Sequence, residues 1–280
     1  MFSFIKNLFG KPAPTVPVLR LTGMIAVSSG TRRGLSLAAL SPSIDKAFNT
    51  KGAKAVALAI NSPGGSPVQS ALIFERIRHL SREKNIPVIS FVEDVAASGG
   101  YWLACAGDEI YANGASVIGS IGVVSAGFGF EGAIEKLGIT RRVYTPGEKK
   151  VMLDPFQPEN QEDIDRLKDL QRDIHEQFVA MVKSRRGSKL TETDKELFSG
   201  AFWTGGKSVE LGLIDHLGEL RQTLKSRFGD KVVIKLIEPK RSMLGLSSSS
   251  NGVTARLAEH SIDHMIAVMD EKSARSRFGL

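Results

Sequence analysis

The sequence predicts an α/β fold, in which a mostly parallel sheet with flanking helices is followed by a C-terminal helical region. Short, continuous apolar runs recur along the first two-thirds of the 280 residues, which is typical of parallel strands buried on both faces. Amphipathic segments separate these runs, and this alternation indicates repeated strand–helix–strand units. The chain is 42% hydrophobic and 24% charged, a balance that allows a full core.

The first half of the chain supplies the clearest elements. Residues 53–60 (AKAVALAI) form an uninterrupted apolar strand, and residues 87–95 (PVISFVEDV) form another that is rich in β-branched residues. The helix expected between them, at residues 68–83, repeats apolar side chains at helical spacing. The other expected elements are strands at residues 16–28, 109–112, 117–124 and 140–144, and helices at residues 43–49, from residue 98 onward and at 130–137.

The character of the chain changes after Pro158. Residues 159–185 form a long amphipathic helix. Shorter helical pieces at residues 190–198 and 208–211 flank a turn at 202–206. The serine-rich segment 241–252 indicates a flexible linker. The expected organisation is a tail at residues 1–15, a domain at 16–240, the linker at 241–252 and a helical segment at 253–280.

The composition excludes several kinds of site. Cys105 is the single cysteine, so the chain can form no intrachain disulfide and no multi-cysteine metal site. We expect a buried packing thiol there, and no metal or other cofactor. The basic residues give a net charge of +7 but do not interleave with aromatic residues, so no nucleic-acid partner is expected.

The sequence also bears on the compartment. No apolar run reaches the roughly 18 residues needed to cross a bilayer, and residues 1–14 lack the features of a secretory signal. We therefore expect a cytoplasmic protein. Residues 1–11 (MFSFIKNLFGK) place apolar side chains at helical spacing, so peripheral contact with the inner membrane is a further expectation. A tail that packs on its own domain is the alternative.

Ser98 lies in the segment VAASGGYW (95–102), between a predicted strand and a predicted helix. Backbone N–H groups and the helix dipole at such a point favour developing negative charge. Ser98 is therefore a candidate nucleophile. A serine that merely caps the helix is the alternative.

A second motif, NSPGGS (61–66), ends the preceding strand. Pro63 fixes one backbone dihedral, and Gly64 and Gly65 can adopt conformations closed to other residues. This pattern predicts exposed N–H groups that could hold the oxyanion of a tetrahedral intermediate, at about 3–4 kcal/mol per donor. An ordinary tight turn is the alternative.

A serine hydroxyl needs a base at neutral pH. Lys150 precedes the apolar segment VMLDPF (151–156), which could desolvate its ammonium and favour the neutral amine. Lys149 is adjacent, and the chemistry does not separate the two. Of the five histidines, only His216, beside Asp215, follows a predicted strand, and this pair is the candidate for a triad.

The motifs NSPGGS (61–66), AASGGY (96–101), GSIGV (119–123), WTG (203–205) and LGLID (211–215) occur in this order. Together they resemble the signal peptide peptidase A family of serine proteases, over about residues 16–220. The resemblance implies a crotonase/ClpP-like fold and a Ser-Lys dyad. It assigns the serine to Ser98 and the lysine to Lys150, because Pro155 and Phe156 follow that lysine at the family's offsets.

The resemblance implies further site residues and a function. Ser120 matches a serine that orients the lysine, and the backbone N–H groups of Gly65 and Gly99 match the oxyanion hole. The implied activity is a serine endopeptidase that cleaves apolar, unfolded peptides such as remnant signal peptides. A homo-oligomeric ring is implied as well. Two other functions stay open: an acyl-CoA-processing enzyme of crotonase type and a non-catalytic, membrane-associated scaffold.

Overall fold

The computed structural model describes residues 13–27 and 34–237, together with Ser276 and Phe278. Its strands are β1 (Thr15–Thr22), β2 (Val56–Ser62), β3 (Val88–Ala97), β4 (Glu109–Ala112), β5 (Val117–Gly119), β6 (Phe202–Thr204), β7 (His216–Leu217) and β8 (Val233–Ile237). Its helices are α1 (Leu37–Phe48), α2 (Pro67–Lys84), α3 (Gly99–Ala104), α4 (Glu131–Lys136), α5 (Gln161–Arg186), α6 (Asp194–Leu197), α7 (Gly205–Glu210) and α8 (Leu220–Phe228), with 3-10 turns at Glu148–Lys150 and Gly187–Lys189.

The strands form one sheet, in the order β6-β5-β3-β2-β1-β8, with β4 beside β3 and β7 beside β4. Every pair of neighbours is parallel except β5 and β6. Parallel neighbours bring their carboxyl ends to the same edge, so the turns that follow β2, β3 and β5 meet there. The prediction of a mostly parallel α/β fold is confirmed.

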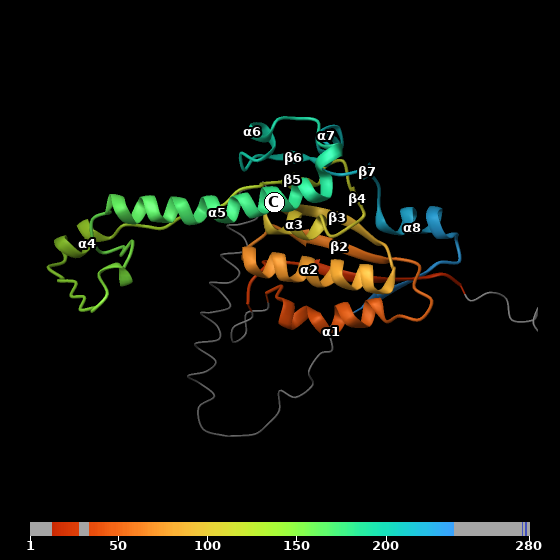
Figure 1. Ribbon diagram of the computed structural model, residues 1–280, viewed down its shortest axis with the longest axis horizontal. Helices are drawn as coiled ribbons and strands as arrows, with labels where there is room; N and C mark the ends of the chain where they lie inside the picture. Colours follow the sequence, from red (N-terminus) through yellow and green to blue (C-terminus); the bar gives the residue numbers. More distant parts are fainter. Residues whose placement is uncertain (1–12, 28–33, 238–275, 277, 279–280) are drawn as a thin grey trace, which may run out of the picture.

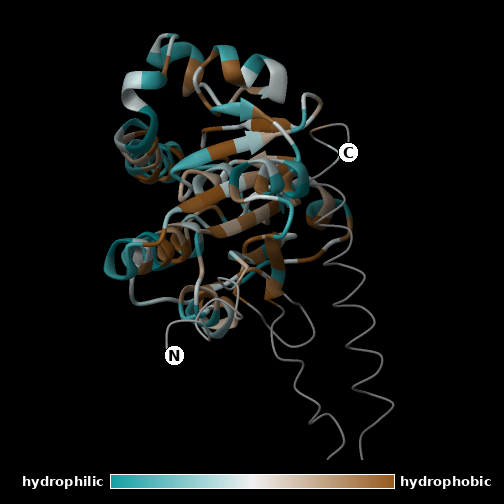
Figure 2. Ribbon diagram, turned by 90° about the vertical axis from the view of Figure 1, so that its right-hand side faces the viewer, coloured by the Kyte–Doolittle hydropathy of each residue, from teal (hydrophilic) through white to brown (hydrophobic). Residues whose placement is uncertain are grey.

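The two faces of the sheet are buried against different helices (Figures 1 and 2). Leu58 and Ile60 of β2 pack in a core shared with α1, α2, α3 and the end of α5. Ala57 and Ala59 point the other way, into a smaller core with Leu224 of α8. All seven residues of β2 are buried, because helices cover the strand on both sides.

Local sequence signals fix the ends of α2. Ser66 accepts a hydrogen bond from the Gln69 N–H, Pro67 occupies the first helical position, and Asn85 ends the helix in a left-handed conformation. This helix therefore begins directly after the NSPGGS motif.

Several expected elements differ from the observed ones. Residues 140–144 form no strand, and the strand expected at residues 117–124 ends at Gly119. The expected helix at residues 190–198 is reduced to α6. The expected turn at residues 202–206 is instead the strand β6 followed by the start of α7. Apolar residues suggested a strand at 140–144, but they lie exposed: Tyr144 is 90% accessible.

The long helix α5 carries part of the chain away from the body. Its 26 residues span about 39 Å, and its buried side chains are Phe178, Val182 and Arg186, all in the C-terminal half. The N-terminal half projects, with α4 at its far end (Figure 1). We call residues 124–160 the arm. Within the described ranges, no helix is both long and apolar enough to span a bilayer.

Three of the expected segments lie wholly or mostly outside the residues that the structure describes. Of the tail at 1–15, the structure describes only residues 13–15. The linker at 241–252 lies outside the described residues, as does the helical segment at 253–280 apart from Ser276 and Phe278.

Candidate functional site

Ser98 occupies a strained turn between β3 and α3. Its φ is 52° and its ψ is −123°, a backbone conformation that a non-glycine residue adopts at a cost and that recurs at functional turns. The Ser98 N–H donates to the Gly119 carbonyl at 2.8 Å, and the Ser98 carbonyl accepts from the Tyr101 N–H at 2.9 Å. Ser98 stands at the N-cap position of α3, but its hydroxyl caps no N–H group. The capping alternative is therefore wrong for this serine.

The turn at Gly64 and Gly65 lies directly against Ser98. Gly64 has φ 105° and Gly65 has φ 141°, both in the region that favours glycine. A Cβ on Gly64 would lie 2.8 Å from the Ser98 Cβ and 2.9 Å from the Gly99 nitrogen. A Cβ on Gly65 would lie 2.1 Å from the Ile25 oxygen. The two motifs thus form one contiguous surface, and only glycine fits between them.

Two N–H groups of this surface have no acceptor in the described part of the chain: those of Gly65 and Gly99. The neighbouring groups are bonded, since the Gly64 carbonyl accepts from the Ile25 N–H at 2.8 Å and the Ser66 N–H donates to the Ile25 carbonyl at 2.7 Å. These bonds hold the loop while leaving both N–H groups able to bind an anionic oxygen.

Ser120 follows β5 and resembles Ser98 in backbone conformation. Its φ is also 52°, and its N–H donates to the Ala201 carbonyl at 2.7 Å. Because β5 pairs with β3 from Val95–Val117 to Ala97–Gly119, the two serines leave the sheet side by side.

Ser98, Ser120, Gly64 and Gly65 line one cavity of about 800 Å³, a volume typical of a ligand site. The opposite walls come from α5 and from the segment between α6 and β6. The α5 residues are Lys168, Gln171, Arg172 and His175, and the others include Phe198, Ser199, Gly200, Phe202 and Phe278. Phe278 packs edge-on against Phe202, with ring centroids 5.0 Å apart.

Lys150 lies apart from this cavity within one chain. It ends the 3-10 turn Glu148–Lys150 in the arm, its side chain is exposed, and it does not line the cavity. The Lys150 side chain is exposed, so the expected burial among residues 151–153 is not found within the described part of the chain. Lys149 forms an ion pair with Glu162 of α5, whereas Lys150 has no carboxylate partner among the described residues.

Contacts within the arm hold the turn that carries Lys150. Phe156 packs against Phe130, with ring centroids 5.7 Å apart. Arg141 forms an ion pair with Asp154 at 3.2 Å and lies over the Phe156 ring. The residues that follow Lys150 therefore form a small packed unit at the far end of α5.

The Asp215–His216 pair does not form a triad. The Asp215 carboxylate accepts hydrogen bonds from Arg186 at 2.7 Å, from Lys189 at 2.6 Å and from the Ile110 N–H at 2.8 Å. His216 packs on Tyr111, with ring centroids 5.0 Å apart, in a separate cavity of about 530 Å³. Among the described residues, no group of His, Cys, Asp and Glu side chains is arranged to hold a metal ion.

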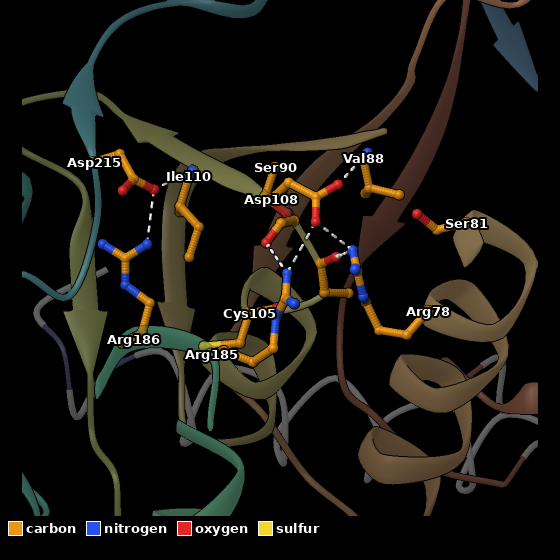
Figure 3. Close-up of polar contacts among 12 residues, drawn as sticks. Arg78, Ser81, Val88, Ser90, Cys105, Asp108, Ile110, Arg185, Arg186 and Asp215 are labelled. Carbon is orange, nitrogen blue, oxygen red and sulfur yellow. Dashed lines mark hydrogen bonds and ion pairs between the residues drawn. The ribbon is translucent and has the colours of Figure 1, made fainter. Parts of the chain in front are cut away.

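The pair Arg185 and Arg186 anchors α5 to the body (Figure 3). Arg185 donates to the Cys105 and Gly107 carbonyls at 2.9 and 2.7 Å. The Arg186 side chain is 3% exposed and pairs with Asp215. Burial opposes ionisation of Asp215, but the hydrogen bonds from Arg186 and Lys189 outweigh it and hold the pKa of that carboxyl below its ordinary value. The wall of the cavity is thereby fixed to the sheet.

Asp108, between α3 and β4, connects the same anchor to Arg78 of α2. It accepts from Arg78 at 2.7 Å and from the Val88 N–H at 3.0 Å (Figure 3). Burial raises the pKa of this carboxyl, but the Val88 N–H and the two arginines lower it by more, so the net direction is downward. Burial raises the pKa of the Cys105 thiol to about 11, which fits a packing role.

Sequence reasoning did not identify the residues of the long helix that line the cavity. His175 is one of them, and its Nε2 atom is buried without a partner in the described residues. The signal was its spacing: Lys168, Gln171, Arg172 and His175 fall at positions that share one helix face.

Comparison with known proteins gives the family. The model of Peptidase family S49 matches residues 81–232. The Na(+)/H(+) antiporter NhaA of Brucella abortus is 52% identical over 273 residues, which make up 95% of this chain and 37% of that protein. The chain thus spans a little over a third of the length of that relative, whose name describes the whole protein.

Other relatives match over different shares of their length. A Synechocystis protein whose name describes a protease is 34% identical over 235 residues, which cover 81% of this chain and 80% of that protein. The chloroplastic serine protease SPPA of Arabidopsis thaliana is 31% identical over 209 residues, 71% of this chain and 30% of that protein. The S49 model matches more than half of the 280 residues, and the chain belongs to peptidase family S49.

Proposed function

We propose that this chain is a serine endopeptidase in which Ser98 is the nucleophile and Lys150 is the general base. One observation carries the proposal: the Ser98 hydroxyl caps no helix, stands in a strained turn and lines a cavity beside two unbonded backbone N–H groups. Such a turn presents a nucleophile next to an oxyanion hole.

The proposed reaction proceeds by acyl transfer. The neutral Lys150 amine accepts the proton of the Ser98 hydroxyl as its oxygen attacks the peptide carbonyl carbon. The N–H groups of Gly65 and Gly99 stabilise the oxyanion. The C–N bond then breaks, and the lysine returns the proton to the leaving amine. A water molecule, deprotonated by the same lysine, then attacks the ester carbonyl carbon, the bond from that carbon to Ser98 Oγ breaks, and the lysine returns the proton to Oγ. Ser120 orients the lysine throughout.

The lysine of the dyad comes, in this proposal, from a second copy of the chain. Lys150 is exposed in the arm and away from the cavity of its own chain. The arm exposes large apolar side chains that a partner would cover: Val124 is 70% accessible, Phe128 82%, Leu137 72% and Ile139 56%. An arm that docks on a neighbouring copy would bury these residues and desolvate Lys150.

The substrate we propose is an extended, apolar peptide, such as a remnant signal peptide. Apolar side chains of Met24, Val123, Val124 and Phe202 line the cavity. Phe202 belongs to β6, which ends the order of strands in the sheet. A peptide could therefore add to this edge as a further strand.

Mixing two inactive variants tests the dyad and its assembly together. Ser98→Ala and Lys150→Ala should each be inactive against a fluorogenic peptide. If each site combines Ser98 of one copy with Lys150 of another, subunit exchange at equal amounts should restore about a quarter of wild-type activity. The matched control, Ser98→Ala mixed with Lys149→Ala, should show how much activity depends on the neighbouring lysine.

The outcome separates the competing readings. No recovery after proven subunit exchange would refute a dyad shared between copies. An active Ser98→Ala variant would refute the nucleophile. A fluorophosphonate probe that labels wild type but not Ser98→Ala would distinguish a serine peptidase from an acyl-CoA-processing enzyme or a scaffold, because neither of those needs a nucleophilic serine.

A further inference from the structure

The charged residues that line the Ser98 cavity are all basic. No aspartate or glutamate is among its lining residues, whereas Lys168 and Arg172 both are. The walls contributed by the sheet edge and by the segment after α6 are uncharged. A cavity with cations on one wall and no anion of its own attracts an anionic group from its ligand.

The basic residues share one face of α5. Lys168, Arg172 and His175 are spaced at i, i+4 and i+7, so their side chains lie along a single stripe. One guanidinium nitrogen of Arg172 donates a hydrogen bond to Asp169 at 2.9 Å. The guanidinium has further N–H donors that can bind a ligand. Lys168 has no ion-pair partner among the described residues. Both cations can therefore meet a ligand.

His175 adds an independent observation. Its Nε2 atom is buried and makes no hydrogen bond within the described residues. A buried polar atom without a hydrogen-bond partner is destabilising. A polar group of a bound ligand would supply the missing partner at the wall that holds Lys168 and Arg172.

The cavity also accommodates an apolar side chain. Phe278 of the same chain lines it and packs edge-on against Phe202, with ring centroids 5.0 Å apart. This contact gives the size and character of a group that the cavity accepts. The cavity thus combines aromatic and cationic lining residues with Ser98 and Gly64.

We propose that the cationic face of α5 is an anion subsite, and that the preferred substrates carry a carboxylate close to an apolar residue. The carboxylate is either an aspartate or glutamate side chain or the free carboxyl end of the peptide. Lys168 and Arg172 attract it, and the Nε2–H tautomer of His175 donates a hydrogen bond to it. The inference rests on the proposed function, because it defines the substrate class of the same cavity.

Matched peptides test the preference. One series places Asp or Asn at each position around a constant apolar segment, and a second pairs a free carboxyl end with its amide. Wild type should hydrolyse the preferred anionic peptide about five- to tenfold more efficiently than its neutral isostere, as expected for partly exposed ion pairs. The series that shows the preference identifies the source of the carboxylate.

Variants of α5 assign the preference to residues. The double variant Lys168→Gln/Arg172→Gln should lose the preference, so that the ratio of kcat/KM for the anionic peptide to kcat/KM for its neutral isostere falls to about one. Arg166→Gln is the matched control, because Arg166 lies on the same helix, carries the same charge and does not line the cavity. Raising the salt concentration should shrink the preference in wild type and leave the double variant unchanged.

Binding to Ser98→Ala separates this inference from the proposed function. The affinity of the labelled peptides for that variant, measured by fluorescence anisotropy, needs no catalysis. Tighter binding of the anionic peptide, abolished by the Lys168→Gln/Arg172→Gln change, would support the subsite even if no peptide were hydrolysed. Equal binding of both peptides would overturn it. So would a double variant that loses both peptides equally or changes its oligomeric state, since the α5 face would then serve the fold or a neighbouring copy.

Discussion

Replacing Arg186 with methionine should destabilise the chain by about 3 kcal/mol, because it strands a buried carboxylate. The Arg186 side chain is 3% exposed and that of Asp215 is 10% exposed. The arginine donates to Asp215 at 2.7 Å and to the Gly212 carbonyl at 2.9 Å. Methionine fills much of the same volume but makes neither hydrogen bond.

The size of the expected loss of stability depends on the hydrogen bonds that Asp215 retains in the variant. Removing one partner of a buried ion pair costs about 3–5 kcal/mol. Asp215 retains Lys189 at 2.6 Å and the Ile110 N–H at 2.8 Å, which favours the lower end of that range. For a domain of this size, about 3 kcal/mol corresponds to a fall in Tm of roughly 6–12 °C.

Thermal unfolding followed by circular dichroism, at one fixed protein concentration, measures this effect. Lys189→Met is the matched control: it removes the other cation from the same carboxylate, but Lys189 is 46% exposed, so its loss should cost under about 1 kcal/mol. The double variant Arg186→Met/Asp215→Leu should recover most of the stability, because no buried charge is left unpaired and the remaining Lys189 ammonium is 46% exposed. A Tm change for Arg186→Met no larger than that for Lys189→Met would refute the reasoning.

The pH dependence supplies a second test of the same pair. Burial opposes ionisation of Asp215, but its hydrogen bonds outweigh burial and lower its folded-state pKa. The Asp215 contribution to stability is therefore complete above the ordinary pKa of an aspartate carboxyl. It is lost as the pH falls through the lower pKa that Asp215 has in the folded state. The Tm difference between wild type and Arg186→Met should stay constant near neutral pH and shrink below about pH 4.

Four further predictions concern the site and the start of the chain. The double variant Ser98→Ala/Lys150→Ala should hydrolyse peptides no more slowly than either single variant, because the two groups act as a unit; an additive loss would contradict a dyad. Gly64→Ala should reduce kcat strongly with little change in KM, since its Cβ would lie 2.8 Å from the Ser98 Cβ and 2.9 Å from the Gly99 nitrogen; normal turnover would exclude the oxyanion surface. Activity should rise toward alkaline pH, because a lysine base works only as the neutral amine; a rate already flat from pH 6 would count against Lys150. Deleting residues 2–11 should abolish co-flotation with anionic vesicles and spare hydrolysis of a soluble peptide; unchanged flotation would exclude that segment as the membrane contact.

The position of Ser98 could be predicted because its determinants are local. A continuous apolar run defines β3, and small residues followed by an apolar helix define the turn. The same holds for Gly64 and Gly65, which follow a fully buried strand. Parallel pairing of β2 with β3 then brings the two turns to one edge, as the alternation of strands and helices already implied. The free Ser98 hydroxyl, by contrast, depends on tertiary hydrogen bonds.

The arm shows where sequence patterns fail. Apolar residues between positions 139 and 144 predict a buried strand, because burial is the usual reason for apolar residues at such spacing. In the described part of the chain, Ile139 and Tyr144 are exposed. Lys150 is exposed as well. A pattern reports that a surface is apolar, but not whether its own chain or another one covers it.

Arg186 and His175 show the opposite case, in which polar groups are buried. In the sequence, Arg186 follows Arg185 and His175 lies within a helix of mostly polar residues, and neither pattern marks a buried group. The sequence alone determined most strands and helices of the first half of the chain and the turn that carries Ser98, because neighbouring residues set the hydrophobic period and the allowed backbone conformations. Only the tertiary structure decided which charged side chains are buried, because α5 meets the Gly212 carbonyl and Asp215 through contacts that span 26 and 29 residues.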